Sequence, residues 1–268
     1  MKILKRIAVA VVVFLVIAYL GVLVAVYALQ RDLQYFPNGE ITPLEELSLA
    51  RAQTIRIQVG DGEVVNGWYA PPQSGMPVIV YYKGNYGSFS AEHERFAAWL
   101  DEGYGFVAFD YRGFPLSPGA ISEDAILSDS VEVFDWAREQ GGSDLMIWGR
   151  SLGTGPATYV ASLRDAEALL LETPFLSAVQ VAAERYPFLP VHWLMQDQFP
   201  SNQWISDVEE PVLVAHGTAD TTIDVSNGRR LYDLAPNPDE LWIAEGADHS
   251  GLWDVGLWEQ AREFFARY

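Results

Sequence analysis

The sequence of 268 residues is half apolar and 13% aromatic, which fits one globular domain with a sizeable core and excludes a disordered or fibrous chain. It contains no cysteine, so disulfides, thiolate zinc sites and a cysteine nucleophile are excluded. The formal net charge of −19 argues against nucleic acid as a partner, because binding to a phosphate backbone requires an excess of lysine and arginine.

The amino terminus has an uncharged apolar stretch from residue 7 to residue 29, directly after Lys2, Lys5 and Arg6. At about 1.5 Å per residue it gives a helix of roughly 35 Å, longer than the bilayer hydrocarbon core of about 30 Å. A cleaved signal peptide is the alternative, but its apolar region is usually only about 7 to 15 residues long. We therefore predict a single-pass transmembrane anchor over residues 1–30.

The three basic residues before the apolar stretch favour a cytoplasmic amino terminus and place the main domain on the other side, which is the periplasm in a bacterium. All 36 acidic residues follow the anchor, against 14 of the 17 lysines and arginines, so this part has a formal charge of −22. We interpret that charge as a solubilising surface.

Residues 31–268 are predicted to form one α/β domain, with a mostly parallel sheet and helices on both faces. Alternating segments at 54–59 and 63–71 indicate an antiparallel hairpin at the sheet edge. The runs 77–82 and 105–110 are almost continuously apolar, as strands covered on both faces require. Further strands are expected at 144–148, 167–172, 211–216 and 240–244, with helices at 90–102, 123–140, 153–163 and 225–235 and from 254 onward.

Residues 173–207 interrupt this alternation and are too long for a simple connection. They are predicted to form a helical lid inserted over the carboxyl ends of the strands, where ligands bind in such sheets. Their apolar side chains either line a site for a lipid-like acyl group or pack the insertion onto the sheet; they are Phe188, Leu189, Trp193, Leu194 and Phe199.

The pentapeptide GRSLG at 149–153 follows a buried strand and precedes a helix. A nucleophile on such a tight turn needs small residues two positions before and after it, and Gly149 and Gly153 meet that need. The turn also directs the N–H of Leu152 and the helix amino terminus toward the reaction centre. We predict Ser151 as a nucleophile and Leu152 as an oxyanion-hole donor.

A serine nucleophile needs a base, and the base needs an orienting acid. In this architecture the chain order is serine, acid, histidine. His249 stands on a loop before the last helix and is the predicted base, while Asp220, 29 residues earlier on a loop after a strand, is the predicted acid. Asp224 and Asp248 are the rival acids, although Asp224 is expected to begin the next helix.

The remaining histidines are not expected to be catalytic. His216 should end its strand with a hydrogen bond to local backbone, and His93 should lie on an exposed helix face. His192 and Trp193 lie in the insertion and are predicted to contact the substrate. The segment HER at 93–95 lacks the second histidine of a zinc-protease helix, so neither a metal site nor a cofactor is expected.

The loop KGNYGS at 83–88 follows the first buried strand. Its backbone around Asn85 is the predicted second half of the oxyanion hole, and Lys83 and Tyr86 are predicted to contact the substrate. A phosphate cradle is the alternative, but here the lysine precedes the glycines and the spacing of a P-loop is missing.

The motifs above, together with QRDLQYFP at 30–37, FDYRGFPLSPG at 109–119 and ETPFLS at 172–177, resemble the α/β-hydrolase fold family in their order along the chain. Within that family the chain is similar to the membrane-anchored group of the fungal Bem46 proteins. The resemblance implies a serine hydrolase with Ser151, Asp220 and His249 as its triad. The family usually has His-Gly where this chain has Lys83-Gly84, which puts its substrate preference in doubt.

We expect a membrane-anchored serine hydrolase that cleaves carboxylic esters, or other acyl bonds including thioesters, in a small-molecule substrate. Two alternatives stay open. One is an amidase or peptidase with the same triad. The other is a tethered binding module that has lost activity, for which Lys83 is the only sequence feature. The sequence leaves the oligomeric state undetermined.

Overall fold

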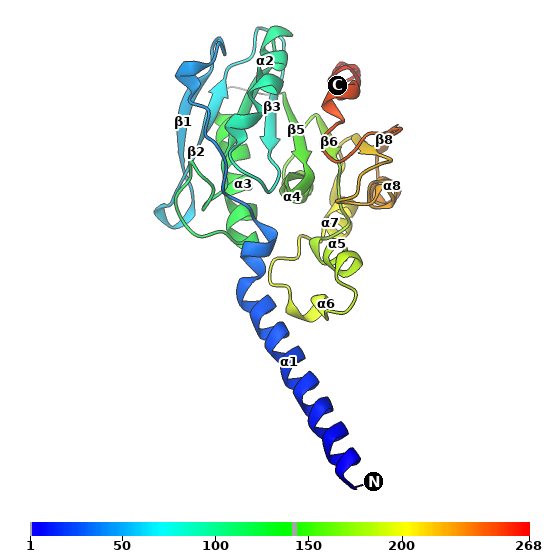
Figure 1. The fold of residues 1–268 in the computed structure, drawn as a ribbon. Coiled ribbons are helices and arrows are strands. Elements are labelled where there is room, and N and C mark those ends of the chain that lie inside the picture. The colour runs from blue at the N-terminus through cyan, green and yellow to red at the C-terminus, as the bar shows by residue number, and fades with distance from the viewer. Residues whose placement is uncertain (1, 141–143) are drawn as a thin grey trace.

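The protein is built on one eight-stranded sheet, seen in a computed structural model that describes residues 2–140 and 144–268 (Figure 1). The strand order is β1-β2-β4-β3-β5-β6-β7-β8. The strands are β1 (Gln53–Gln58), β2 (Val64–Ala70), β3 (Val78–Tyr82), β4 (Gly105–Phe109), β5 (Leu145–Arg150), β6 (Ala168–Glu172), β7 (Val212–Gly217) and β8 (Pro238–Ala244). The pairs β1–β2 and β2–β4 are antiparallel and the other pairs are parallel, which confirms the predicted edge hairpin and the mostly parallel sheet.

The helices lie on both faces of the sheet, as predicted (Figure 1). Side chains of α3, α4 and α8 join the core on one face, and those of α2 and α9 join the core on the other. The bounds are α2 (His93–Asp101), α3 (Glu123–Glu139), α4 (Thr154–Ala161), α8 (Val225–Leu234) and α9 (Leu257–Phe265).

Strand β3 shows why the central strands are apolar throughout. Val78, Val80 and Tyr82 belong to one core, while Ile79 and Tyr81 belong to the other. Successive strand side chains point to opposite faces, so a strand with helices on both sides needs an apolar residue at every position. Because β3 to β8 run in the same direction, their carboxyl ends lie at one edge of the sheet, and the loops that follow them carry polar side chains.

A long amino-terminal helix, α1 (Lys2–Gln34), projects from the domain (Figure 1). Within the described ranges it is the one helix long and apolar enough to cross a membrane. It continues four residues beyond the anchor predicted to end at residue 30, and Gln30 and Tyr35 are buried against the domain. The helix thus enters the domain without a flexible linker.

Residues 173–207 contain three short helices, α5 (Ala178–Arg185), α6 (Val191–Leu194) and α7 (Ser201–Trp204). Phe199 and Phe175 pack beside Gly155, where an added Cβ would lie 2.9 Å from Phe199 Cδ1. The Tyr159 ring of α4 meets the Trp204 ring of α7 at a centroid distance of 5.0 Å. Both ends of the segment thus pack on α4, while α6 lies beside α1 (Figure 1). That it serves as a lid stays a prediction.

Candidate active site

Ser151 lies on the sharp turn between β5 and α4, with a positive φ of 51°. Only small neighbours fit this turn: a Cβ on Gly149 would lie 2.6 Å from the carbonyl oxygen of Gly153, and a Cβ on Gly153 would overlap the carbonyl oxygen of Tyr82. Positive φ is unfavourable for a residue with a side chain, so surrounding contacts must hold it. Thr154 Oγ1 provides one by donating to the carbonyl oxygen of Ser151 at 2.7 Å.

Three side chains from separate loops meet beyond the carboxyl ends of β5, β7 and β8. His249 Nε2 lies 2.9 Å from Ser151 Oγ, and His249 Nδ1 lies 2.7 Å from Asp220 Oδ2. The structure thus brings together the serine, histidine and aspartate named from the sequence. Such a chain of hydrogen bonds can move a proton from the hydroxyl to the imidazole while the carboxylate fixes the ring.

The Asp220 carboxylate is buried and fully hydrogen-bonded. Its Oδ1 accepts from the backbone N–H groups of Thr222 at 2.8 Å and Ile223 at 2.9 Å. Its Oδ2 lies 2.7 Å from His249 and also 3.2 Å from Nε2 of His216. Burial favours the neutral acid, but the hydrogen bonds from the two histidines and the charge of His249 outweigh it and hold the pKa of Asp220 well below its ordinary value.

The rival carboxylates serve local backbone instead. Asp224 caps α8 by accepting from Ser226 N at 2.9 Å, and Asp248 accepts from Ser250 N and Gly251 N at 3.0 and 2.9 Å. His216 Nε2 lies 2.9 Å from the carbonyl oxygen of Ile223, so it bonds local backbone as expected, but its contact with Asp220 was not foreseen.

The loop at residues 83–88 adjoins Ser151, since a Cβ on Gly84 would lie 3.7 Å from Ser151 Cβ. Two elements hold its backbone. Tyr111 OH donates to the carbonyl oxygen of Lys83 at 3.0 Å, and Phe36 N, just after α1, donates to the carbonyl oxygen of Asn85 at 2.9 Å. The Asn85 side chain also donates to the carbonyl oxygen of Gln34 at 2.9 Å, so the end of α1 is bonded to this loop.

The four residues predicted to contact the substrate do not form one group. Lys83 is only 1% exposed, and its ammonium donates to the carbonyl oxygen of Gly84 and lies 3.8 Å from the centroid of the Phe114 ring. Burial lowers the pKa of Lys83 to about 8, although Asp110 opposes the change. Tyr86 and Trp193 are instead 70% and 88% exposed, and His192 is exposed next to Trp193 on α6.

A buried cluster of charges lies behind the turn and was not foreseen. Arg95 bonds both carboxylate oxygens of Glu172 at 2.8 Å. Arg150, next to Ser151 in the chain, lies 3.3 Å from Glu172, 3.4 Å from Glu92 and 3.4 Å from Oγ of Ser250, which follows His249 in the chain. Arg150 therefore connects the turn of Ser151 to the loop of His249. The sequence offers one signal for it, a charged residue at the end of an otherwise apolar strand.

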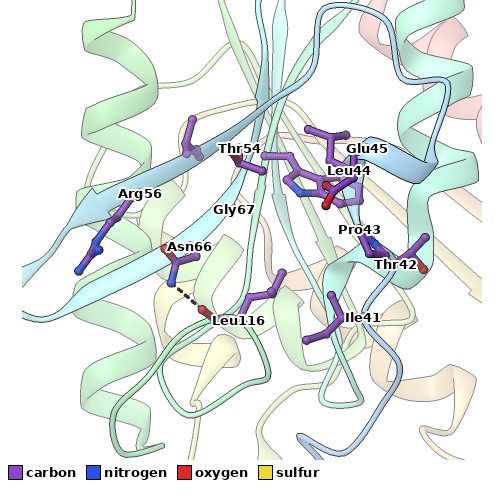
Figure 2. A pocket seen from close by; sticks show the side chains of 12 residues that line it. Ile41, Thr42, Pro43, Leu44, Glu45, Thr54, Arg56, Asn66, Gly67 and Leu116 are labelled. Carbon is purple, nitrogen blue, oxygen red and sulfur yellow. Dashed lines mark hydrogen bonds between the residues drawn. The ribbon is translucent and has the colours of Figure 1, made fainter.

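A hollow of about 430 Å³ lies away from Ser151, at the β1–β2 edge (Figure 2). It is open to solvent, and Asn66 Nδ2 donates to the carbonyl oxygen of Leu116 at its wall. Ser151 itself is 9% exposed. In the part of the chain that the structure describes, no group of three or more histidine, aspartate or glutamate side chains is arranged to hold a metal ion.

A parallel sheet with a serine, histidine and aspartate meeting beyond its strand ends is the architecture of a hydrolase. The chain belongs to the α/β-hydrolase fold family, whose sequence model matches residues 77–189. Over 248 residues it is 32% identical to the uncharacterized protein Rv2307c of Mycobacterium tuberculosis, covering 91% of this chain and 88% of that one. It is also 35% identical over 197 residues to the lysophosphatidylserine lipase ABHD12 of Danio rerio. That match covers 65% of this chain and about half, 51%, of the lipase.

Solved structures have the same fold. The esterase Pf2001 of Pyrococcus furiosus superposes with a TM-score of 0.69 over 87% of this chain and 97% of its own, at 18% identity. The acetyl xylan esterase of Paenibacillus sp. R4 gives a TM-score of 0.66 over 85% and 88%, at 20% identity. These similarities confirm the predicted α/β-hydrolase fold.

Proposed function

We propose that this protein is a membrane-anchored serine hydrolase that cleaves carboxylic esters through an acyl-enzyme on Ser151. The observation that carries the proposal is the continuous chain of hydrogen bonds from Ser151 through His249 to Asp220, at 2.9 and 2.7 Å. Esterase and lipase relatives support ester cleavage as the reaction type.

The reaction begins when His249 Nε2 takes the proton of Ser151 as Oγ attacks the ester carbonyl. The negative charge that develops on the carbonyl oxygen is stabilised by the backbone N–H groups of Leu152 and Asn85, the two proposed donors. The imidazolium then gives its proton to the departing alcohol, which leaves an acyl group on Ser151. A water molecule, activated by the same imidazole, releases the acid and restores the serine.

Asp220 accepts from Nδ1 of His249, so Nε2 is left without a proton and free to act as the base. The low pKa of Asp220 keeps this carboxylate ionised throughout the cycle, because burial is outweighed by its hydrogen bonds. His216 supports the same carboxylate from the other side at 3.2 Å. The negative charge of the triad therefore stays on the Asp220 carboxylate, between His249 and His216.

The apolar helix α1 is the proposed anchor. Its uncharged stretch of residues 7–29 exceeds the bilayer core in length. Most side chains of this stretch are exposed and do not pack against the rest of the protein. An exposed apolar helix of this length is unstable in water and stable in lipid.

The substrate class that we propose is an acyl ester of a lipid. The zebrafish relative is named as a lysophosphatidylserine lipase, and the proposed anchor holds the domain at a bilayer surface. A panel of 4-nitrophenyl esters with acyl chains from acetyl to palmitoyl, with matching anilides, tests this choice. We expect long-chain esters to be preferred. A maximum at acetyl would contradict the lipid substrate, and faster cleavage of anilides would favour an amidase.

The test of the nucleophile is labelling of the full-length protein by a fluorophosphonate probe. We expect labelling of the wild type and of the matched control Ser206→Ala, whose serine is exposed and outside the site. Ser151→Ala should not be labelled and should lose several orders of magnitude in turnover. Equal labelling of Ser151→Ala and wild type would refute the assignment, and an inert wild-type protein would favour a binding module.

A further inference from the structure

The far end of the insertion is apolar and exposed, in a chain that is otherwise strongly acidic. Residues 186–194, here named the insertion tip, contain no lysine, arginine, aspartate or glutamate. Three aromatic side chains of the tip are open to the surroundings: Tyr186 is 41%, Phe188 65% and Trp193 88% exposed. A contiguous exposed apolar surface of this kind marks a place where a protein meets a partner or a membrane.

The insertion tip is attached to α1 well inside its apolar stretch. Tyr19 OH donates to the carbonyl oxygen of Phe188 at 2.8 Å. Twelve residues further along α1, Arg31 bonds the Asp197 carboxylate at 2.9 and 3.1 Å, just beyond the tip. At about 1.5 Å per residue, the insertion runs along α1 for roughly 18 Å. Figure 1 shows α6 lying beside α1, below the sheet.

The position of Tyr19 sets the depth of the insertion tip. Tyr19 precedes Leu29, the last residue of the uncharged stretch, by ten residues, or about 15 Å of helix. The stretch exceeds the bilayer core by roughly 5 Å. With α1 across a bilayer, the carbonyl group of Phe188 therefore lies about 10 to 15 Å along α1 from the edge of the hydrocarbon region.

The backbone of the insertion tip suits such a place. Irregular backbone is tolerated at membrane depth only where its polar groups have partners within the protein. Two residues of the tip, Pro187 and Pro190, have no N–H group to satisfy. The N–H groups of Leu189, Val191 and Trp193 donate to carbonyl oxygens within the tip at 2.9 to 3.0 Å. The carbonyl oxygen of Phe188 accepts from Tyr19 OH of α1.

We propose that the insertion tip is a second membrane-contacting element, immersed in the acyl-chain region of the leaflet that surrounds the carboxyl half of α1. The inference rests on the proposed anchoring of α1. The partner is the hydrocarbon of a phospholipid bilayer, not its charged headgroups, because Arg185 is the only lysine or arginine from 165 to 228 and it follows Glu184. Contact with hydrocarbon is insensitive to salt and to anionic lipid, unlike attraction by basic clusters.

The test uses the absence of cysteine from the chain, which makes any introduced cysteine unique. Full-length variants Trp193→Cys and, independently, Phe188→Cys report on the tip. Val12→Cys reports on the amino-terminal half of the apolar stretch of α1. Tyr268→Cys is the control at the carboxyl terminus, which lies at the opposite end of the molecule (Figure 1). Each is labelled with an NBD fluorophore and reconstituted into phosphatidylcholine vesicles that contain doxyl-labelled lipid, or are exposed to aqueous iodide.

We expect a blue-shifted emission and a loss of intensity with doxyl lipid for the tip and α1 probes, and quenching by iodide only for the probe at position 268. Added phosphatidylserine or salt should leave the ratio of the two quenching constants unchanged at the tip. If both tip probes behave like the probe at 268 while the Val12 probe is quenched by lipid, the inference is wrong and the anchor stands. If the Val12 probe is quenched by iodide, anchoring and inference fail together.

A second copy of the chain is the competing occupant of the tip. In that case the tip probes would self-quench, and dilution with unlabelled protein would relieve this quenching. Such a result without quenching by doxyl lipid would overturn the proposal. Turnover of a water-soluble ester, measured on the unlabelled wild type, reports separately on the proposed chemistry of Ser151.

Discussion

Replacing Lys83 with methionine removes a buried amine at the start of the loop beside Ser151 and is expected to stabilise the protein at neutral pH. The Lys83 side chain is 1% exposed and lies against the Phe114 ring. Burial lowers the pKa of Lys83 to about 8, with Asp110 opposing. Methionine keeps an unbranched chain of similar length without the charge, so it should occupy the same space.

The size and the pH dependence follow from the two pKa values of Lys83. The amine titrates near 10.5 when the chain is unfolded and near 8 when it is folded. Below pH 8 both states hold the proton, and a difference of about 2.5 at roughly 1.4 kcal/mol per pH unit makes the charged form cost about 3 kcal/mol. Between about pH 8 and 10.5 the unfolded state holds more protons, so the stability of the wild type rises with pH.

The variant should thus be more stable than the wild type by up to about 3 kcal/mol at pH 7, and the gap should close toward pH 10.5. Urea unfolding of both full-length proteins in detergent, followed by the fluorescence of the nine tryptophans, measures the gap at each pH. The chain has only three lysines, so NMR of ¹³C-labelled lysine measures the pKa of Lys83 directly. A gap that is constant from pH 7 to 10, or a lysine that titrates near 10.5, would refute the reasoning.

Three further substitutions test the site. Gly153→Ala forces a side chain into the backbone of β3 and should cost several kcal/mol of stability or prevent folding. The control Gly21→Ala, at an open position on α1, should leave the melting temperature unchanged. Asp220→Asn should lower kcat by about 10³- to 10⁴-fold with the fold retained, while Asp248→Asn should change it far less; the reverse order would make Asp248 the acid. Arg150→Ala should lower both kcat and the free energy of unfolding, by up to about 3 kcal/mol, because it leaves a buried carboxylate with one partner fewer. Wild-type kcat in this variant would show that the cluster does not position the site.

The parts of the fold that the sequence predicts are those with local causes. The central strands are recognisable because burial on both faces demands an apolar residue at every position, as in residues 77–82. The glycines on either side of Ser151 are recognisable because a side chain on Gly149 or Gly153 would collide with the backbone. The order of serine, aspartate and histidine follows from the order of the strands.

The parts that escape prediction depend on pairs of residues far apart in the chain. Arg95 and Glu172 are 77 positions apart, and no local pattern says that they share a buried site. The contact of His216 with Asp220 depends on the path of the loop between them. Lys83 was predicted to contact the substrate, but its side chain is buried and its ammonium donates to the carbonyl oxygen of Gly84, which the residues around position 83 do not indicate because lysine is rarely buried.

Because α1 runs directly into the domain, the position of α1 in a bilayer would determine the distance of Ser151 from the lipid surface. No free joint separates Gln34 from Tyr35, which is buried, or from Phe36, which pairs with the loop beside the nucleophile. With α1 in a bilayer, the contacts of Gln34, Tyr35 and Phe36 with the domain would hold Ser151 at a defined height above the lipid. For the proposed anchored hydrolase, substrates would then be selected by the distance of their ester bond from the bilayer as well as by shape.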